Sequence, residues 1–200
     1  MARFHVPQPR IENGMLKVEG DEVKHIRKVL RLKAGDEISV FDGSGKELEG
    51  TIVEERLSSV VIRVKNVHSS KGDSPLEVTL AQSLLKGEKM DYLIQKATEL
   101  GVGKIIPFLS SRSVPLLEKS KRPKRHQRWK RIAIEASKQC WRGAVPEIES
   151  LQNYPEMLQK ATPNSLRLIL WEREGVKLKE ILERSKERKR IFLLSGRKGD

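Results

Sequence analysis

The sequence predicts an α/β protein in two parts, a small β-barrel-like domain followed by a larger domain with a parallel sheet. Three observations support this prediction. Residues 1–68 contain several short alternating runs, residues 76–109 follow the order strand, helix, strand, and the polar, turn-rich stretch 69–75 separates the two as a linker. The second domain is taken to run from residue 76 to residue 200. A chain of 200 residues with 37% apolar content can bury a core in each part.

Residues 1–68 alternate apolar and polar side chains in short stretches, which is typical of β-strands with one buried face. Strands are predicted at residues 3–4, 15–18, 38–41, 48–52 and 60–64. Between the second and third, Asp21 can cap a helix whose apolar residues are Val23, Ile26, Val29 and Leu30. The stretch Asp42-Gly43-Ser44-Gly45 indicates a hairpin. Several strands and one helix predict a small β-barrel-like module.

The stretch 78–109 carries the clearest pattern in the chain. An apolar, strand-like segment around Val78 and Leu80 is followed by a helical pattern that begins near Lys86. Its apolar residues are Met90, Leu93, Ile94, Ala97 and Leu100. The helix is expected to stop at Gly101, because glycine readily takes the left-handed conformation common at helix ends, and an apolar run at 105–109 follows. This order predicts a βαβ unit.

Two further apolar strands are predicted in the last third of the chain, after a connecting region at 145–164 with one short helical piece. Residues 166–172 end in Trp171-Glu172, and residues 191–194 end in Ser195-Gly196. An amphipathic helix through Leu178, Ile181 and Leu182 lies between them. Because ligands of open α/β sheets bind at the carboxyl ends of strands, these two ends and the polar loop 110–114 are candidate parts of a small-molecule site.

The net charge of +13 and the pI near 9.9 predict an anionic partner, nucleic acid first and an anionic membrane surface second. No stretch is long and apolar enough to span a bilayer, and the N-terminus lacks the apolar centre of a signal peptide, so we expect a cytoplasmic protein. The single cysteine, Cys140, excludes an intramolecular disulfide framework. We expect Cys140 to be a small side chain on a buried helix face, and a catalytic thiol is the alternative. The scattered histidines indicate no metal site.

Eight basic residues and no acid occupy residues 119–131. Phosphate contact is one interpretation, since the release of counterions drives such binding, and a solvated basic face is the other. Trp129 within this run can pack in the core or stack on a base, and we expect the core. On the preceding helix, Lys96 and Glu99 are spaced for an ordinary surface ion pair.

Three stretches of the chain resemble a known family. LLKGEKMDYLIQKATELGVGKIIPFLSSRSV (84–114) and RWKRIAIEASKQC with Arg142 (128–142) are similar to the RsmE family, which methylates N3 of a uridine in 16S ribosomal RNA and belongs to the knotted SPOUT methyltransferases. KHIRKVLRLKAGDEISVFDG (24–43) resembles the PUA-like, RNA-binding barrel of the same family. The resemblance extends from Arg3 to about Gly196 and implies a homodimer acting on the small ribosomal subunit or its RNA.

The resemblance also implies site residues. An S-adenosylmethionine site is expected at Leu170, Trp171, Glu172, Leu194, Ser195, Gly196 and Gly199. RNA contacts are expected at Arg3, His25, Lys28, Arg31, Lys86, Lys89, Arg122, Lys124, Arg125, Arg128, Gln139 and Arg142. For Gln139 and Arg142, contact with the facing subunit is the alternative. A lone histidine such as His25 is as often structural. Arg112 is the catalytic candidate, because a fixed cation can stabilise charge on the uracil oxygens; its alternative is to position phosphate only.

The resemblance breaks at the end of the sequence. The family loop Gly-Pro-Glu-Gly-Gly is replaced by Gly196-Arg197-Lys198-Gly199-Asp200, and the family's later strand, loop and knot-forming helix do not follow. Deleting one C from GGC-CCG-GAA-GGG-GGA-T gives codons for the observed ending, so we expect a frameshift and an incomplete knot. A genuinely divergent loop is the alternative. Two other functions stay open: an inactive RNA-binding protein of the same fold, and, ranked last, an anionic-membrane binder.

Overall fold

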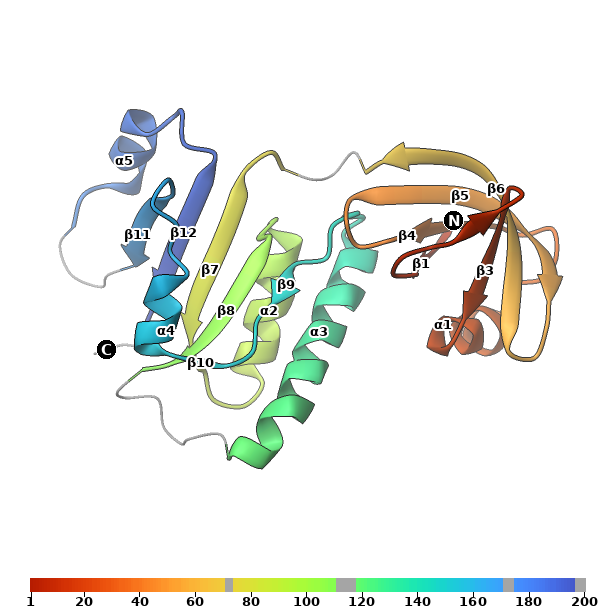
Figure 1. The fold of residues 1–200 in the computed structure, drawn as a ribbon, viewed down its shortest axis with the longest axis horizontal. Coiled ribbons are helices and arrows are strands. Elements are labelled where there is room, and N and C mark those ends of the chain that lie inside the picture. Colours follow the sequence, from red (N-terminus) through yellow and green to blue (C-terminus); the bar gives the residue numbers. More distant parts are fainter. Residues whose placement is uncertain (71–73, 111–117, 171–174, 197–200) are drawn as a thin grey trace. The chain divides into compact units, whose positions relative to one another are not determined.

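The computed structural model describes residues 1–70, 74–110, 118–170 and 175–196 and forms two compact units (Figure 1). The barrel unit consists of Met1–Asp73 and Ser137–Val145, and the α/β unit of Ser74–Ala136 and Pro146–Asp200. The first change of unit falls inside the 69–75 stretch. The return of Ser137–Val145 to the barrel unit has no counterpart in the division drawn from the sequence.

The barrel unit contains one six-stranded sheet. Its elements are β1 (Ala2–His5), β2 (Ile11–Glu12), β3 (Met15–Glu19), α1 (Asp21–Lys24), the π-helical segment η1 (His25–Val29), β4 (Glu37–Phe41), β5 (Lys46–Glu55) and β6 (Ser59–Ser69). The strand order is β1-β4-β5-β6-β3-β2, parallel between β1 and β4 and antiparallel elsewhere. The strands and the hairpin predicted between β4 and β5 are confirmed.

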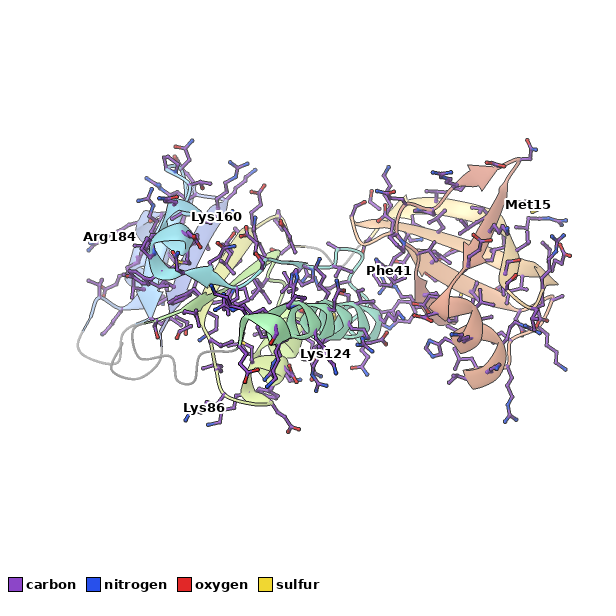
Figure 2. The ribbon with its side chains drawn as sticks, turned by 60° about the horizontal axis from the view of Figure 1, so that its bottom comes forward. Met15, Phe41, Lys86, Lys124, Lys160 and Arg184 are labelled. Atoms are coloured by element: carbon purple, nitrogen blue, oxygen red, sulfur yellow. The ribbon has the colours of Figure 1, made fainter. Side chains whose placement is uncertain are left out.

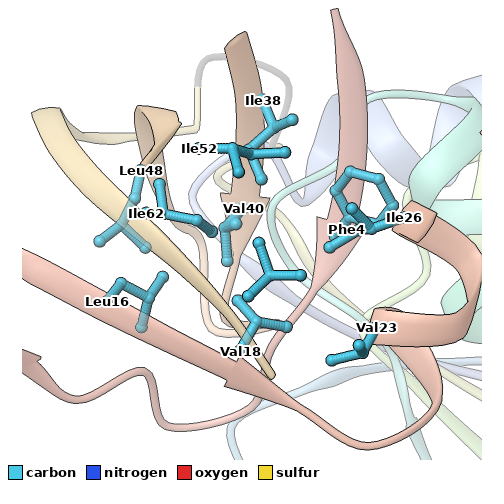
Figure 3. Close-up of a cluster of buried hydrophobic side chains, with 11 residues drawn as sticks. Phe4, Leu16, Val18, Val23, Ile26, Ile38, Val40, Leu48, Ile52 and Ile62 are labelled. Carbon is cyan, nitrogen blue, oxygen red and sulfur yellow. The ribbon is translucent and has the colours of Figure 1, made fainter. Parts of the chain in front are cut away.

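The sheet and helix of this unit enclose one hydrophobic core (Figure 3). It contains Phe4, Leu16, Val18, Val23, Ile26, Ile38, Val40, Leu48, Ile52, Val60 and Ile62. Burial of each large side chain contributes about 1.5–3 kcal/mol, so this cluster is the main source of the unit's stability. Where β5 crosses β6, a Cβ on Gly50 would lie 2.5 Å from the carbonyl oxygen of Arg63, so only glycine fits.

The helix of the barrel unit differs from the prediction in two ways. Its N-cap is Gly20, and Asp21 is the first helical residue with no capping side chain. The second half is π-helical, and the wider turn shifts the phase of the apolar pattern. Val23 and Ile26 are buried as predicted, whereas Val29 is 66% exposed and Leu30 is also exposed. Their assignment to the buried face was therefore wrong.

The α/β unit is built on a parallel sheet. Its elements are β7 (Glu77–Ser83), α2 (Lys89–Glu99), β8 (Lys104–Leu109), the 3-10 turn η2 (Lys119–Lys121), α3 (Arg122–Gln139), β9 (Glu147–Ile148), β10 (Gln152–Asn153), α4 (Tyr154–Gln159), β11 (Leu166–Leu170), α5 (Leu178–Arg184) and β12 (Arg190–Ser195). The strand order is β10-β8-β7-β12-β11, with β9 also pairing with β8. Because β7 and β8 are parallel and joined by α2, the predicted βαβ unit is confirmed.

The helices of this unit follow most of the predicted pattern. Met90 and Ile94 of α2 are fully buried, and Trp129 of α3 is 1% exposed, so its expected place in the core is confirmed. Gly101 ends α2 with φ +96°, a conformation that favours glycine. Leu100 was wrongly placed on the buried face: it is the C-cap residue and is 85% exposed.

One face of the sheet packs against α4. Met157 of α4 joins Ala81, Ile106, Phe108, Phe192 and Leu194 in a second hydrophobic cluster. The predicted strands β11 and β12 and the helix α5 are present, but α5 buries no residue. Its apolar side chains Leu178 and Leu182 are exposed, as are Ile169 and Leu170 of β11. The outer strand is therefore much less covered than β7 and β8.

Candidate functional site

The carboxyl ends of the parallel strands meet at one edge of the α/β unit. Leu170 of β11 is the register partner of Ser195 in β12, and Ser195 is the partner of Gln82 in β7. Gln82 in turn is the partner of Pro107 in β8. The two strand ends that the sequence singled out therefore lie side by side, followed by the ends of β7 and β8.

The two central strands of this edge, β7 and β12, belong to different crossovers. The chain leaves β7 through α2 to β8 on one side, whereas β12 on the other side of β7 receives the chain from β11. Open α/β sheets bind ligands outside the carboxyl ends of their strands. The β7–β12 pair, ending at Ser83 and Ser195, is the candidate small-molecule site.

Two polar residues at this edge were missed by the sequence analysis. Gln82 and Ser83 are buried at the end of β7, and Gln82 Nε2 donates to the Ser83 carbonyl over 3.0 Å. Ser83 Oγ donates to Ser110 Oγ, just after β8, over 3.1 Å. The signal was present as a polar pair closing the apolar run of β7, since buried polar side chains need partners. These hydrogen bonds fix the start of the two loops that leave the edge.

The predicted cofactor residues fall into two groups. Leu170, Ser195 and Gly196 lie at the edge, and Leu194 packs into the α4 cluster, which leaves only its backbone for a ligand. Trp171, Glu172 and Gly199 lie outside the described residues, as does the catalytic candidate Arg112.

A second candidate region of the α/β unit is basic and exposed. Lys86 and Lys89, at the start of α2, and Lys124, in the first turns of α3, have exposed side chains, whereas Arg122 and Arg125 are half-buried. Figure 2 labels Lys86 and Lys124, which both lie at the outer surface of the unit. The geometry is suited to contact with phosphate groups.

Helices α2 and α3 run side by side in Figure 1 and are joined by an ion pair. Arg128 Nε donates to Asp91 Oδ2 over 2.8 Å, and this hydrogen bond raises the pKa of the guanidinium. Arg128 therefore stays charged and exposed, and the negative charge of Asp91 partly balances its positive charge. The predicted pair of Lys96 and Glu99 on α2 is confirmed, with Nζ and Oε2 2.7 Å apart.

The predicted RNA residues of the barrel unit differ in exposure. Lys28 and Arg31 are exposed beside the π-helical segment, and Arg31 has φ +55°. His25 is half-buried, its ring edge-to-face with Phe4 and its Nδ1 3.6 Å from Glu22 Oε2. A structural role therefore accounts for His25, whereas Lys28 and Arg31 are free to face a ligand.

Arg3 lies inside the barrel unit. Its Nε donates to Glu47 Oε1 over 2.9 Å, and its side chain is 3% exposed. Burial raises the pKa of Glu47, but hydrogen bonds from Arg3 and Ser39 outweigh this effect and hold it below its ordinary value. Arg142, also predicted as an RNA contact, is buried as well. The burial of both side chains argues against direct contact of Arg3 or Arg142 with RNA.

The returning segment Ser137–Val145 is fixed to the barrel unit by charged groups. Arg3 Nη1 and Nη2 donate to the carbonyl oxygens of Ser137 and Arg142, each over 2.8 Å. Lys138 forms an ion pair with Glu22 at 2.5 Å. Gln139, a predicted RNA contact, is exposed on this segment. The sequence could not show that these residues return to the first domain.

Other ligand classes find no support in the part of the chain that the structure describes. No three His, Cys, Asp or Glu side chains there are placed to share a metal ion. None of the helices in the described ranges has the length and apolarity needed to cross a bilayer. Cys140 is half-buried, with its sulfur 3.9 Å from the Ser137 carbonyl oxygen.

Family models and curated proteins similar to this chain indicate which family it belongs to. The sequence matches a family described as RNA methyltransferase domain over residues 72–199, and one described as RNA methyltransferase PUA domain over residues 18–65. Two curated relatives are named ribosomal RNA small subunit methyltransferase E. The Bacillus subtilis protein is 35% identical over 74% of this chain and 58% of its own length; the Synechocystis protein is 30% identical over 98% and 64%. The chain thus spans about three fifths of the length of these relatives.

A solved structure agrees with the fold. The crystal structure of a ribosomal RNA small subunit methyltransferase E from Neisseria gonorrhoeae, bound to S-adenosyl methionine, superposes with a TM-score of 0.87 at 30% identity. The match covers 98% of this chain and 80% of the Neisseria gonorrhoeae chain. With a barrel unit matching the PUA model and an α/β unit matching the methyltransferase model, the chain belongs to the RNA methyltransferase family whose curated members are named ribosomal RNA small subunit methyltransferase E.

Proposed function

We propose that this chain provides the fold of an S-adenosylmethionine-dependent enzyme that methylates N3 of a uridine in 16S ribosomal RNA. The observation that carries the proposal is the edge where the carboxyl ends of β11, β12 and β7 lie side by side, in a chain of the RNA methyltransferase family. The family's solved member from Neisseria gonorrhoeae is bound to S-adenosyl methionine, which supports that ligand here. By the same resemblance, the protein acts as a homodimer on the small subunit or its RNA.

The residues at the edge fit such a ligand. Leu170 and Ser195 form the last register pair of β11 and β12 among the described residues, at the carboxyl ends of both strands. Ser195 adds a hydroxyl group, and Leu170 adds an exposed apolar side chain. These neutral groups suit an adenosine, which offers ring nitrogens, hydroxyls and an apolar face. Among the described residues, the carboxyl-terminal positions of β7, β11 and β12 hold no lysine or arginine.

In this proposal, bound S-adenosylmethionine supplies the methyl group, and the chain's own residues align and stabilise the acceptor. Alignment of two reactants can contribute up to about 7–11 kcal/mol of the barrier. Loss of the N3 proton spreads negative charge over the two uracil carbonyl oxygens, and a fixed cation nearby stabilises it. We assign that role to Arg112, which follows the end of β8 by three residues. The exposed lysines Lys86, Lys89 and Lys124 hold the RNA phosphates.

Methyl transfer is tested by incubating the protein with labelled S-adenosylmethionine and small subunits that lack the modification. The expected product is 3-methyluridine, identified by mass spectrometry of the nucleosides. Arg112→Ala is expected to lower turnover by roughly 10²–10³-fold with little change in RNA affinity, and Arg112→Lys to restore part of it. Unchanged turnover in Arg112→Ala would remove this residue from the reaction.

Calorimetric titration separates the enzyme from an inactive RNA-binding protein of the same fold. The proposal requires saturable heat on addition of S-adenosylmethionine. Heat on addition of RNA alone would support the inactive alternative, for which the departure of residues 196–200 from the family loop is the motivating observation. Light scattering that gives the mass of one chain would contradict the homodimer.

A further inference from the structure

Trp141 is an exposed aromatic residue in an unusual backbone conformation. Its side chain is 53% exposed, in contrast to the buried Trp129. Its φ is +60°, and it is the bulkiest non-glycine residue with positive φ among the described residues. A bulky residue in this region costs about 1–3 kcal/mol, and such a cost persists only where the surroundings impose it.

The surroundings of Trp141 hold its turn on both sides. Before and after it, the carbonyl oxygens of Ser137 and Arg142 accept hydrogen bonds from Arg3. One residue further, Gly143 N donates to Ser70 Oγ over 3.0 Å, and Gly143 O accepts from Gly45 N over 3.2 Å. The backbone of the turn is therefore fixed before any ligand arrives, and the indole is presented at low entropic cost.

The indole also has a cation beside it. Arg3 Cζ lies 4.0 Å from the ring centroid of Phe41 and 5.7 Å from that of Trp141, both within the range of cation–π contact. Because Glu47 holds the Arg3 guanidinium in place, this contact orients the indole while about half of the side chain stays in solvent. A rigid, half-exposed aromatic ring is the form of side chain on which nucleobases stack.

We infer that Trp141 is a stacking platform for an unpaired nucleobase of the RNA substrate. The inference rests on the proposed function and adds a contact of the barrel unit to it. The residues around the indole favour a base over a protein partner, because the exposed Gln139 and the small Gly143 flank it, with no contiguous run of exposed apolar side chains from Ser137 to Val145. An unpaired base is required, since bases within an RNA helix have no free face.

The test compares two variants with the wild-type protein. Trp141→Gly removes the ring and suits the positive φ, so it is expected to fold at least as stably as the wild type. Trp141→Phe keeps an aromatic face. The probe is a single-stranded RNA of about ten nucleotides, and the same strand in a duplex is the control.

Stacking contributes about 1–3 kcal/mol per base, so Trp141→Gly is expected to weaken single-strand binding by roughly 5- to 150-fold. Trp141→Phe is expected to stay within a few-fold of the wild type. Duplex binding and the slope of affinity against salt concentration should not change, because the indole neutralises no phosphate.

Each other result overturns the inference. Equal affinity of Trp141→Gly and wild type for the single strand would exclude stacking. An equal loss for single strand and duplex would assign Trp141 to the structure of the turn, and a lower mass by light scattering would assign it to contact with a second copy. A wild-type protein that binds neither RNA would refute the proposed function itself, which is a different failure.

Discussion

The two units of the molecule carry their charges in different ways. The barrel unit has 15 basic and 12 acidic residues, a net charge of +3, and the α/β unit has 25 and 15, a net charge of +10. In the barrel unit, Arg3 is buried in an ion pair with Glu47, and the half-buried Lys138 pairs with Glu22. In the α/β unit, Lys86, Lys89 and Lys124 are exposed. The barrel unit therefore places part of its charge in internal ion pairs, whereas most of the positive excess of the chain belongs to the α/β unit.

The largest expected effect comes from breaking the internal pair of the barrel unit. Glu47→Gln leaves the guanidinium of Arg3 buried without a carboxylate, which costs about 3–5 kcal/mol for a pair of this kind. Hydrogen exchange monitored by mass spectrometry should show faster exchange in β4 and β5 than in the wild type. Glu54→Gln, at an exposed pair with Arg56, is the control and is expected to change stability by under about 1 kcal/mol. Equal protection in the two variants would contradict an internal role for the Arg3–Glu47 pair.

Low pH should lower the stability of both units, because each contains a glutamate with a lowered pKa. The pKa values of Glu47 and Glu149 are both below the ordinary value of 4.5, because hydrogen bonds from basic partners outweigh the effect of burial. Their stabilising contribution is complete above pH 4.5 and is lost as the pH falls through the lowered values. Urea unfolding at a series of pH values should show a falling midpoint below about pH 4.5. In a variant with both glutamates changed to Gln, the urea midpoint should depend less on pH. An unchanged slope of midpoint against pH would show that these two carboxylates do not cause the acid sensitivity.

The matching carboxylate of the α/β unit should matter less. Glu149 accepts from Lys104 at 2.7 Å and lies 3.3 Å from Lys160, but these lysine side chains are 32% and 45% exposed. Once Glu149 is replaced by Gln, water can solvate both ammonium groups, so the cost is expected to be about 1 kcal/mol. Hydrogen exchange in β8 is the measurement. A loss of protection in β8 as large as the loss that Glu47→Gln causes in β4 and β5 would contradict the expected difference. The two carboxylates would then stabilise their units equally.

The smallest expected effect concerns the outward-facing charge. Lys124→Ala should lower the slope of log affinity against log salt by about 0.7–0.9, with a few-fold loss of RNA affinity, because one phosphate contact disappears. Lys17→Ala in the barrel unit is the matched control, since Lys17 is exposed and paired with Glu19 at 2.6 Å. An equal change in slope for both variants would mean that Lys124 makes no more of a phosphate contact than the paired Lys17.

Local patterns predicted the elements of the fold well. The apolar spacing of Met90 and Ile94 together with Gly101 was sufficient for the βαβ unit, because helical period and chain termination are local properties. The pattern failed at Val29 and Leu30, where the π-helical segment changes the period that the prediction assumed. Nothing in the local sequence distinguishes such a turn from an α-helix.

The site was predicted less completely than the fold. The adjacency of Leu170 and Ser195 followed from the rule that ligands bind at strand ends, and it is confirmed by their register. Gln82 was missed because its place between Ser195 and Pro107 depends on β7 being central in the sheet. Arg3 was taken for an RNA contact because its acceptors, on Ser137 and Arg142, lie 134 and 139 residues further along the chain. No pattern of near neighbours could reveal that burial.

The return of Ser137–Val145 to the barrel unit has a consequence for how the molecule is made. During synthesis the ribosome releases the chain from its N-terminus, so β1 emerges long before the carbonyl groups that its arginine requires. Closing so long a loop is slow compared with forming a local hairpin. The barrel unit is therefore expected to stay incomplete until Ser137–Val145 has been translated, with Arg3 remaining hydrated until its acceptors on Ser137 and Arg142 are available.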